Sequence, residues 1–171
     1  VSHLLVIDPE LGQRVAQGLG MAELPAPAAD AATVQDLALS PALRIIDRMK
    51  PTLEGRCVAI LVDDGSNAKT VAALQKAIAA ENATAKIIAP KVGGVTLSDG
   101  KHLAADAQLA GAPSAQFDAV AWVITIESGE RLRKDAAAQD WFRDAFGHLK
   151  AIAACKATRL ILESAGVAPD A

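Results

Sequence analysis

The sequence of 171 residues contains no tyrosine, only three histidines and only two cysteines. Any mechanism that requires a tyrosinate is therefore excluded within this chain. His3, His102 and His148 are widely dispersed and show none of the spacings typical of metal sites, so we expect no metal ligation. Cys57 and Cys155 are two isolated thiols, which favours a reducing, cytoplasmic environment over a disulfide framework or a zinc site.

The sequence also lacks a large excess of positive or negative charge, and it lacks long apolar runs. The net charge is −3 and the pI is about 5.6, so the chain has no electrostatic footprint for nucleic acid or an anionic membrane surface. No apolar run approaches the roughly 20 residues that a membrane span needs. We expect neither nucleic acid nor membrane as a partner. What is present, 51% apolar and 22% charged residues, is typical of a well-covered α/β domain.

The strongest pattern is the stretch RCVAILVDDGSN. Its residues 57–62 form an unbroken apolar run, which predicts a strand covered on both faces. Turn residues follow at 63–67, where Ser66 or Asn67 can cap a helix predicted over 68–80. Strand, polar elbow and helix make the first half of a βαβ unit, and ligands of such sheets lie at the carboxyl ends of the strands.

Further along the chain, strands and helices continue to alternate. We expect strands at 85–89, 118–126 and a short buried strand at 151–155, a hairpin at 90–100, and helices at 135–149 and 158–164, the last stopped by Gly166. Residues 101–116 give no clear pattern. The alternation predicts an open, mostly parallel, doubly wound sheet of flavodoxin-like type with helices on both faces.

The N-terminal third has a different character. The chain begins at Val1 without methionine, so we expect a fragment of something longer. Asp8-Pro9 predicts a helix that ends near Gly18, and the Ala- and Pro-rich stretch 21–36 predicts a linker. Ser40-Pro41 predicts a short amphipathic helix before Pro51. The expected division is a helical tail at 1–20, a linker with a short helix at 21–55 and the sheet domain at 56–171.

Asp63, Asp64 and Ser66 are the first candidate site, because they end the first strand of the sheet domain. They could bind a metal or a phosphate. However, adjacent carboxylates on a strand end point in different directions and repel an anion from the following helix, and no glycine-rich phosphate loop is present. We therefore expect a turn and a helix cap here.

Cys155 is the second candidate, because it ends a short strand and precedes a helix, where a nucleophile elbow places its reactive atom. A reactive thiolate needs a basic partner. Lys156 is adjacent, no histidine follows, and His148 lies seven residues upstream. The alternative is a small buried hydrophobe.

Two further clusters favour structural roles. A helical stripe of aromatic residues predicts core positions for Trp141, Phe142 and Phe146. A small basic cluster, balanced by neighbouring acids, predicts a solvated face. Its basic members are Arg131, Arg133 and Lys134, and its acidic members are Glu127, Glu130 and Asp135.

The order of these segments resembles a known family. The stretches GRCVAILVDDG, APKVGGVTLSDG, FDAVAWVITIESG and DAFGHLKAIAACKATRLILESAGV, in this order, resemble the C-terminal domain of large-subunit monofunctional haem catalases of the hydroperoxidase II type. VSHLLVIDPELGQRVAQGLGM resembles the closing helix of the catalase core, and SPALRIIDRMKPTLEGR resembles the connector that follows it. The resemblance covers nearly the whole chain.

That domain is itself similar to the class I glutamine amidotransferase-like superfamily, which includes the ThiJ/PfpI thiol enzymes and chaperones. Active members carry a Glu after the first strand, a Gly-Gly turn after the central strand and a Cys-His elbow. Here residues 63–69 contain no Glu, 125–129 contain no Gly-Gly pair, and no His follows the elbow at 154–158. Either Cys155 or Lys156 occupies the nucleophile position, depending on the alignment.

The resemblance therefore implies an accessory, non-catalytic domain with no catalytic, cofactor or metal residue of its own. The parent would be a catalase that decomposes hydrogen peroxide, with its haem bound outside this chain, since catalases hold haem iron through a tyrosine. The implied partners are the catalase core of the same chain and the other subunits of a homotetramer. The alternatives are a holdase-type chaperone and a thiol hydrolase or deglycase that uses Cys155.

Overall fold

The structure, a computed structural model, describes residues 1–28, 36–44 and 48–168. The chain divides into two units, Val1–Lys50 and Pro51–Ala171. Within the described ranges, the helices are too short or too polar for any of them to span a membrane.

The first unit contains two helices, α1 (Ser2–Ile7) and α2 (Pro9–Gly18). The carboxylate of Asp8 accepts two backbone N–H groups of the first turn of α2, at 2.8 and 3.2 Å, and Pro9 occupies the first helical position. The helix predicted from Asp8 to Gly18 is thus confirmed, whereas α1 was not predicted. Gly12 lets the helices approach closely, because a Cβ there would lie 2.5 Å from the side chain of Leu5.

The connecting region is described only in part. Residues 29–35 and 45–47 lie outside the described residues, and residues 41–43 form a turn. The linker at 21–36 and the short helix after Ser40 therefore remain predictions.

The second unit is built on a parallel five-stranded sheet. Its strand order is β5-β2-β1-β6-β7, and each of the four pairings is parallel. The five strands are β1 (Cys57–Val62), β2 (Thr84–Ala89), β5 (Ala107–Gln108), β6 (Ala119–Val123) and β7 (Ala151–Ala153). A separate antiparallel pair consists of β3 (Val95–Thr96) and β4 (His102–Leu103).

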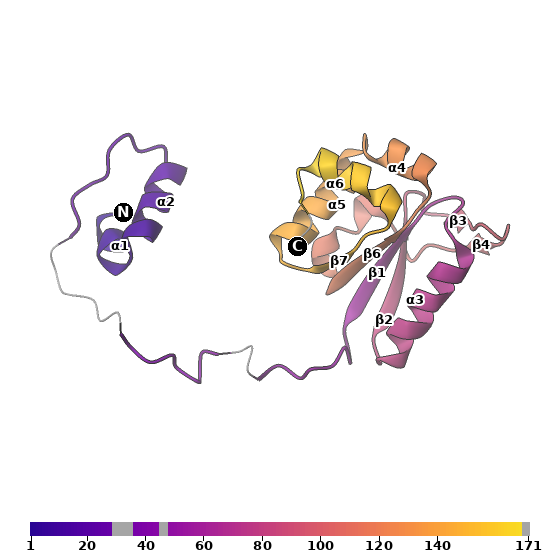
Figure 1. Cartoon of the computed structure of the whole chain (residues 1–171), viewed down its shortest axis with the longest axis horizontal. Coiled ribbons are helices and arrows are strands. Elements are labelled where there is room, and N and C mark those ends of the chain that lie inside the picture. The colour runs from indigo at the N-terminus through magenta and orange to yellow at the C-terminus, as the bar shows by residue number, and fades with distance from the viewer. Residues whose placement is uncertain (29–35, 45–47, 169–171) are drawn as a thin grey trace. The chain divides into compact units, whose positions relative to one another are not determined.

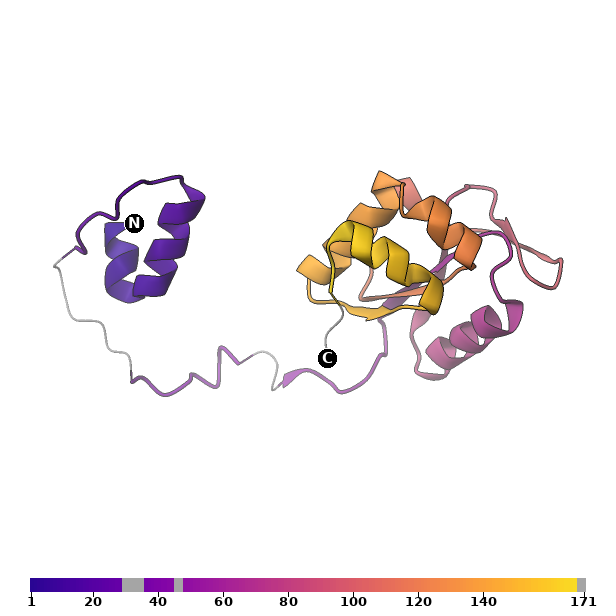
Figure 2. The ribbon, with the colours of Figure 1, turned by 45° about the horizontal axis from the view of Figure 1, so that its top comes forward.

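Helices cover both faces of this sheet (Figures 1 and 2). One face packs against α3, and the other packs against the C-terminal helices. The helices of this unit are α3 (Ala68–Ala80), α4 (Ile126–Leu132), α5 (Ala136–Gly147) and α6 (Arg159–Ala165). Because side chains alternate along a strand, Ile60 and Val62 of β1 point to the α3 side, and Ala59 and Leu61 point to the other. The predicted doubly wound α/β fold is confirmed.

Aromatic packing fills the larger core between the sheet and α5. Trp122 of β6 stacks on Phe142 with ring centroids 4.2 Å apart, and its edge meets Trp141 at 5.4 Å. Trp141 and Phe142 are buried, as predicted. The prediction that Phe146 is a core residue is wrong. Phe146 is 42% exposed, because it lies beside the buried stripe of α5 and not in it.

Several predicted boundaries are also wrong. The strand expected over 118–126 ends at Val123, because Thr125 caps a new helix, α4, by accepting the N–H of Ser128 at 3.1 Å. The hairpin expected at 90–100 pairs residues 95–96 with 102–103 instead. The helices α5 and α6 each differ from their predicted ranges by one or two residues at either end.

The last strand differs most in character from the prediction. β7 is the edge of the sheet and covers only Ala151–Ala153, with Ala151 and Ala153 exposed and Ile152 half-buried. The buried strand expected at 151–155 is therefore wrong, and Cys155 lies after the strand. Gly166 does terminate α6, in the left-handed conformation at φ 71°.

Candidate functional site

The topological switch point of the sheet lies between β1 and β6. From β1 the chain proceeds to β2 on one side and returns to β6 on the other, so the carboxyl ends of β1 and β6 open a crevice. The hollow at this point lies beside the ends of both strands, the start of α4 and the loop after β2. It is lined by Asp63, Asp64, Lys91, Thr125, Glu127, Ser128 and Arg131. These residues therefore occupy the position where sheets of this type bind ligands.

Asp63 is held by an ion pair across the crevice. Asp63 is only 4% exposed, and its carboxylate accepts a hydrogen bond from the half-exposed guanidinium of Arg131 in α4. A nearly buried carboxylate is costly to desolvate unless it is paired. The prediction that Arg131 belongs to a purely solvated basic face is therefore wrong, since this arginine neutralises Asp63.

Asp64 points away from Asp63, as expected for adjacent residues at a strand end. It accepts the backbone N–H of Thr96 at 2.8 Å and the ammonium of Lys91 at 3.0 Å. The Thr96 N–H bond, followed by the Lys91 contacts, lowers the pKa of the Asp64 carboxyl below its ordinary value. Asp64 thus remains ionised and ties the β3 segment to the elbow.

Ser66 and Asn67 shape the elbow. The Ser66 hydroxyl is fully buried, accepts the N–H of Asp63 at 2.8 Å and lies 2.6 Å from the carbonyl oxygens of Asp63 and Val123. It therefore joins the ends of β1 and β6. Asn67 caps α3 by accepting the N–H of Thr70 at 2.9 Å. The predicted turn and cap are confirmed, with Asn67 as the capping residue.

Glu127 is the only lining carboxylate at the start of α4. It lies in the first helical turn, where a negative charge is favoured. Its own backbone N–H, followed by the Thr125 hydroxyl, lowers the pKa of its carboxyl. The side chain therefore suits a fixed negative charge at the helix start.

Cys155 does not lie on a strained elbow. It precedes the 3₁₀ helix η4 (Lys156–Thr158) with φ −91° and ψ 169°, an ordinary extended conformation. Outside glycine, the described residues with positive φ are Asn82 and Leu149, so neither Cys155 nor Lys156 adopts a left-handed backbone. A nucleophile elbow needs a sharp, strained turn to expose its reactive atom.

The surroundings of Cys155 do not activate it. Its thiol lies 3.7 Å from the carbonyl oxygen of Ile124, to which it donates. The hollow that it borders is lined by Ala154, Lys156, Arg159, Leu162, Glu163, Val167 and Ala168, with no histidine among these residues. Arg159 pairs with Glu163 at 3.0 Å. A thiol that donates to a carbonyl, with no histidine in the lining of its hollow, lacks the usual proton acceptor of a nucleophilic cysteine.

The remaining candidates are not brought together. His3 lies in α1, His102 in β4, and His148 follows α5. Over residues 1–28, 36–44 and 48–168, no group of three or more His, Cys, Asp or Glu side chains is placed to hold a metal. Cys57 begins β1, and burial raises the pKa of its thiol, which disfavours a thiolate there.

Sequence reasoning missed two contributors to this region, Arg131 and Gly129. Gly129 brings α4 against η4, because a Cβ at this position would lie 2.4 Å from the carbonyl oxygen of Ala157. The cap signal at Thr125, followed by an acid at Glu127, could have indicated α4. Nothing local could have indicated the partner of Arg131, which lies 68 positions away in the sequence.

Comparisons with known proteins agree on one family. A family model described as the C-terminal domain found in long catalases matches residues 54–171. Catalase C of Rhizobium meliloti is 46% identical over 169 residues, which cover 98% of this chain and 24% of that protein. Catalase HPII of Pseudomonas aeruginosa is 35% identical over 150 residues, 88% of this chain and 21% of that protein. The chain thus spans about a quarter of the length of these curated relatives.

Solved structures show the same fold at low sequence identity. Oxidized DJ-1 of Toxoplasma gondii matches with a TM-score of 0.58 and 19% identity, over 66% of this chain and 62% of that one. A ThiJ/PfpI domain protein of Brachyspira murdochii matches with a TM-score of 0.59 and 16% identity, over 66% and 65%. These likenesses concern the fold alone.

Proposed function

Because this chain belongs to the family of C-terminal domains found in long catalases, we propose that it is the accessory, non-catalytic domain of a catalase that decomposes hydrogen peroxide to water and oxygen. Its role is to stabilise the subunit and the assembly of subunits. The parts that we propose are a closing segment of the catalase core at 1–20, a connector at 21–55 and the accessory domain at 56–171.

One observation carries the non-catalytic part of this proposal: the crevice where the fold would place a ligand is crossed by the ion pair between Asp63 and Arg131. Cys155 also supports a non-catalytic role, because its backbone is unstrained and its thiol donates to a carbonyl. Polar groups that are already tied to each other hold the scaffold and leave no activated nucleophile.

The residues of this chain do not fit a haem site. Catalases hold haem iron through a tyrosine, and the chain contains none. We propose that the haem belongs to another part of the longer protein and that the partners of this domain are that catalase core and neighbouring subunits, in a homotetramer. A cytoplasmic location is part of the proposal and is supported by the two free cysteines.

The two alternatives have weaker support. A thiol hydrolase or deglycase would need an activated Cys155, and the contacts of that residue do not supply activation. A holdase-type chaperone rests on the likeness to DJ-1 and ThiJ/PfpI structures, which concerns the fold alone. The identity to catalases favours the accessory role over both.

Deletion of residues 54–171 from a full-length catalase that carries this domain tests the role. We expect subunits that dissociate more readily in sedimentation and lose activity faster on heating, because the contacts proposed for this domain are lost. Cys155→Ser in the intact protein is the control and should change neither property. Unchanged assembly and heat resistance after the deletion would contradict an accessory role.

A further inference from the structure

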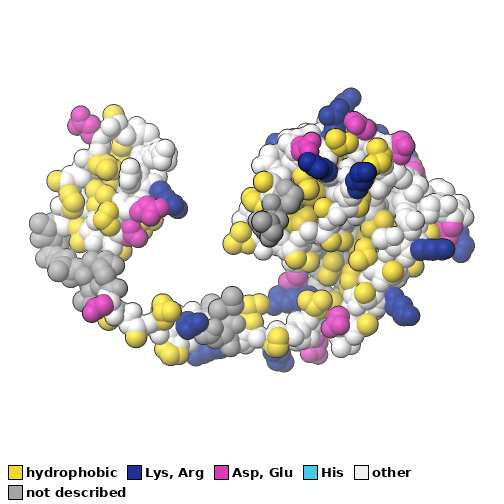
Figure 3. Space-filling model, in the orientation of Figure 1, with side chains coloured by type: hydrophobic (Ala, Val, Ile, Leu, Met, Phe, Trp, Pro, Cys, Tyr) yellow, Lys and Arg dark blue, Asp and Glu magenta, His cyan; other side chains and the backbone are white. Residues whose placement is uncertain are grey.

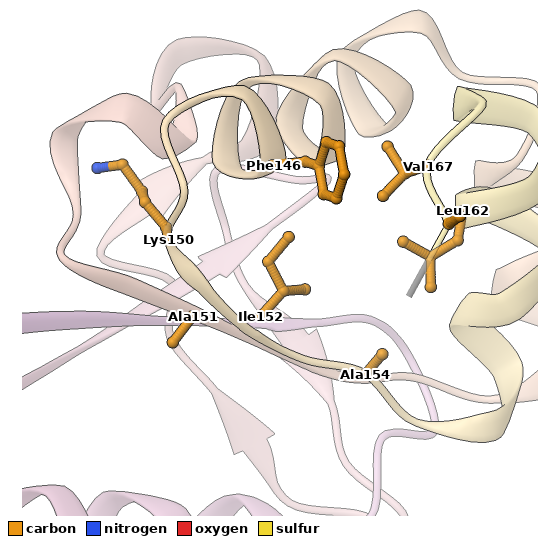
Figure 4. A pocket seen from close by; sticks show the side chains of 8 residues that line it. Phe146, Lys150, Ala151, Ile152, Ala154, Leu162 and Val167 are labelled. Carbon is orange, nitrogen blue, oxygen red and sulfur yellow. The ribbon is translucent and has the colours of Figure 1, made fainter. Parts of the chain in front are cut away.

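Two surfaces beside the strands of the sheet unit differ in what covers them. Beside the edge strand β7, Figure 4 shows the side chains of Phe146, Ile152 and Leu162 around an apolar hollow, and nothing in the described part of the chain shows what covers it. The elbow between β1 and α3, residues 63–68, is instead covered by a segment of this chain. This segment, the strap, consists of residues 94–103 and contains β3 and β4.

The strap supplies acceptors to backbone N–H groups of the elbow. The N–H of Gly65 donates to the carbonyl oxygen of Thr96 at 2.8 Å, and the N–H of Ala68 donates to the hydroxyl of Ser98 at 3.0 Å. Ala68 is the first residue of α3, so its N–H has no partner within the helix. In sheets of this type, N–H groups at the start of a helix that follows a strand are those to which anionic ligands bind. The strap therefore takes the position of a ligand at this elbow.

Hydrogen bonds in the opposite direction fasten the strap to the elbow. The N–H of Ser98 donates to the carbonyl oxygen of Ser66 at 2.9 Å, and the N–H of Thr96 donates to the carboxylate of Asp64 at 2.8 Å. The ammonium of Lys91, which precedes the strap, forms an ion pair with the same carboxylate at 3.0 Å. Asp64 is therefore the side chain whose removal should loosen the strap most directly.

The strap is paired within itself. Among the described residues, β3 and β4 form a two-stranded sheet apart from the five-stranded one, and a Cβ at Gly94 would lie 2.1 Å from the carbonyl oxygen of Leu103. Val95 anchors the strap in the core on the α3 side and is 2% exposed, whereas Leu97 and Leu103 are half-buried. On the face shown in Figure 3, charged and other non-hydrophobic atoms cover the end of the unit where Figure 1 places β3 and β4. A segment with its own pairing and few buried contacts can open locally while the main sheet stays folded.

We propose that the strap is a built-in occupant of the elbow that opens as one unit, with Asp64 as the residue that holds it closed. Opening releases the N–H groups of Gly65 and Ala68 together and leaves the pairing of the five strands intact. Access of any ligand to this elbow then requires that the strap opens first. This conformational device does not depend on the proposed role in a catalase.

Native-state hydrogen exchange of the complete 171-residue chain, followed by NMR, tests the proposal. The amides of Gly65, Ala68, Thr96 and Ser98 come from both sides of the contact, so opening of the strap as a unit exposes all four together. We expect these four amides to share one protection factor, at least about tenfold below that of the amides in the centre of β1. Protection closer to that of β1 would overturn the proposal, because the strap would then open only with the whole unit. Four unrelated protection factors would overturn it as well.

Matched variants test the role of Asp64. Asp64→Ala removes the acceptor of Thr96 and Lys91, and we expect about tenfold faster exchange at the other three amides of the contact, with no change in β1. Glu81→Gln removes an exposed carboxylate at the opposite end of α3 and should change neither set of amides.

Two results with Asp64→Ala would contradict the proposal. Unchanged exchange at the three amides would mean that Asp64 does not hold the strap, and an equal rise in β1 would mean that the strap does not open separately. If Asp64→Ala fails to fold, Ser98→Ala provides the same test at an exposed position, because it removes the acceptor of the Ala68 N–H. Its reporters are then the amides of Gly65, Thr96 and Ser98, with the same two contradicting results.

Discussion

At the scale of single residues, the Asp63–Arg131 pair shows what sequence reasoning could and could not reach. The divergence of Asp63 and Asp64 follows from strand geometry and was predictable. The ion pair was not, because Arg131 has acidic neighbours of its own, and only the parallel pairing of β1 with β6 brings α4 over Asp63. Chemistry that depends on a contact between distant segments has no local signature.

Replacement of Arg131 by methionine should destabilise the sheet unit. The variant leaves the nearly buried Asp63 carboxylate without its counter-ion, and we expect a loss of about 1–2 kcal/mol, less than for a fully buried pair because Arg131 is half-exposed. Urea unfolding, monitored by circular dichroism, measures this loss in the free energy of unfolding. Asp63→Asn combined with Arg131→Met should recover part of the loss. A single variant as stable as the unmodified chain would mean that water solvates Asp63 well enough without the pair.

Two glycines in helices should respond to alanine in opposite directions. Gly129→Ala places a methyl group against the Ala157 carbonyl, so α4 must move away from η4, and we expect a loss of about 1–3 kcal/mol. Gly147→Ala has open space at the end of α5 and should be neutral or stabilising by up to about 1 kcal/mol. Thermal unfolding of both variants distinguishes them. Equal melting temperatures would contradict the close approach of α4 to η4.

At the scale of elements, the local sequence pattern predicted those helix ranges and helix ends that depend on neighbouring residues. The range of α3, a cap at Ser66 or Asn67 and the stop at Gly166 were predicted from the sequence because each depends on neighbouring residues. The length of β6 was overestimated because the apolar run continues through Ile126 into α4. The exposure of β7 was missed because AIAAC has the composition of a buried strand, and position at a sheet edge is a property of the topology.

Asp118 joins two of these elements and should make stability depend on pH. It accepts the Cys57 N–H at 2.8 Å and the Arg56 guanidinium at 2.9 Å, so it ties the start of β6 to the start of β1. The Cys57 N–H bond and the Arg56 ion pair lower the pKa of the Asp118 carboxyl below its ordinary value of 3.8. The stabilisation is therefore complete above that ordinary value and is lost as the pH falls through the lowered pKa.

The corresponding experiment compares the unmodified chain with Asp118→Asn in urea at about pH 6 and about pH 3. We expect the unmodified chain to be more stable at the higher pH and the difference between the two proteins to shrink at the lower one, where the carboxyl of the unmodified chain is partly protonated. The effect should be small, since the Asp118 side chain is 39% exposed. A constant difference between the two proteins at both pH values would mean that ionisation of Asp118 plays no part.

At the scale of the whole molecule, the fold and the family could be predicted from the order of segments. The absence of tyrosine, of a Gly-Gly pair at 125–129 and of a histidine after Cys155 is a property of the sequence and required no structure. The structure adds that Asp63, Asp64 and Ser66, at the carboxyl end of β1, each have a structural partner. The edge position of β7 belongs to this scale as well, because it is set by the strand order of the sheet.

We propose that this domain contributes stability and assembly but no reaction step. This proposal is tested most directly by the initial rate of hydrogen peroxide decomposition per haem in a full-length catalase that carries the double variant Cys155→Ser and Glu127→Gln. These substitutions remove the thiol of one strand-end hollow and the Glu127 carboxylate of the other. We expect a rate within about twofold of the unmodified enzyme. A rate at least about tenfold lower, in an enzyme with unchanged haem content and assembly, would contradict it.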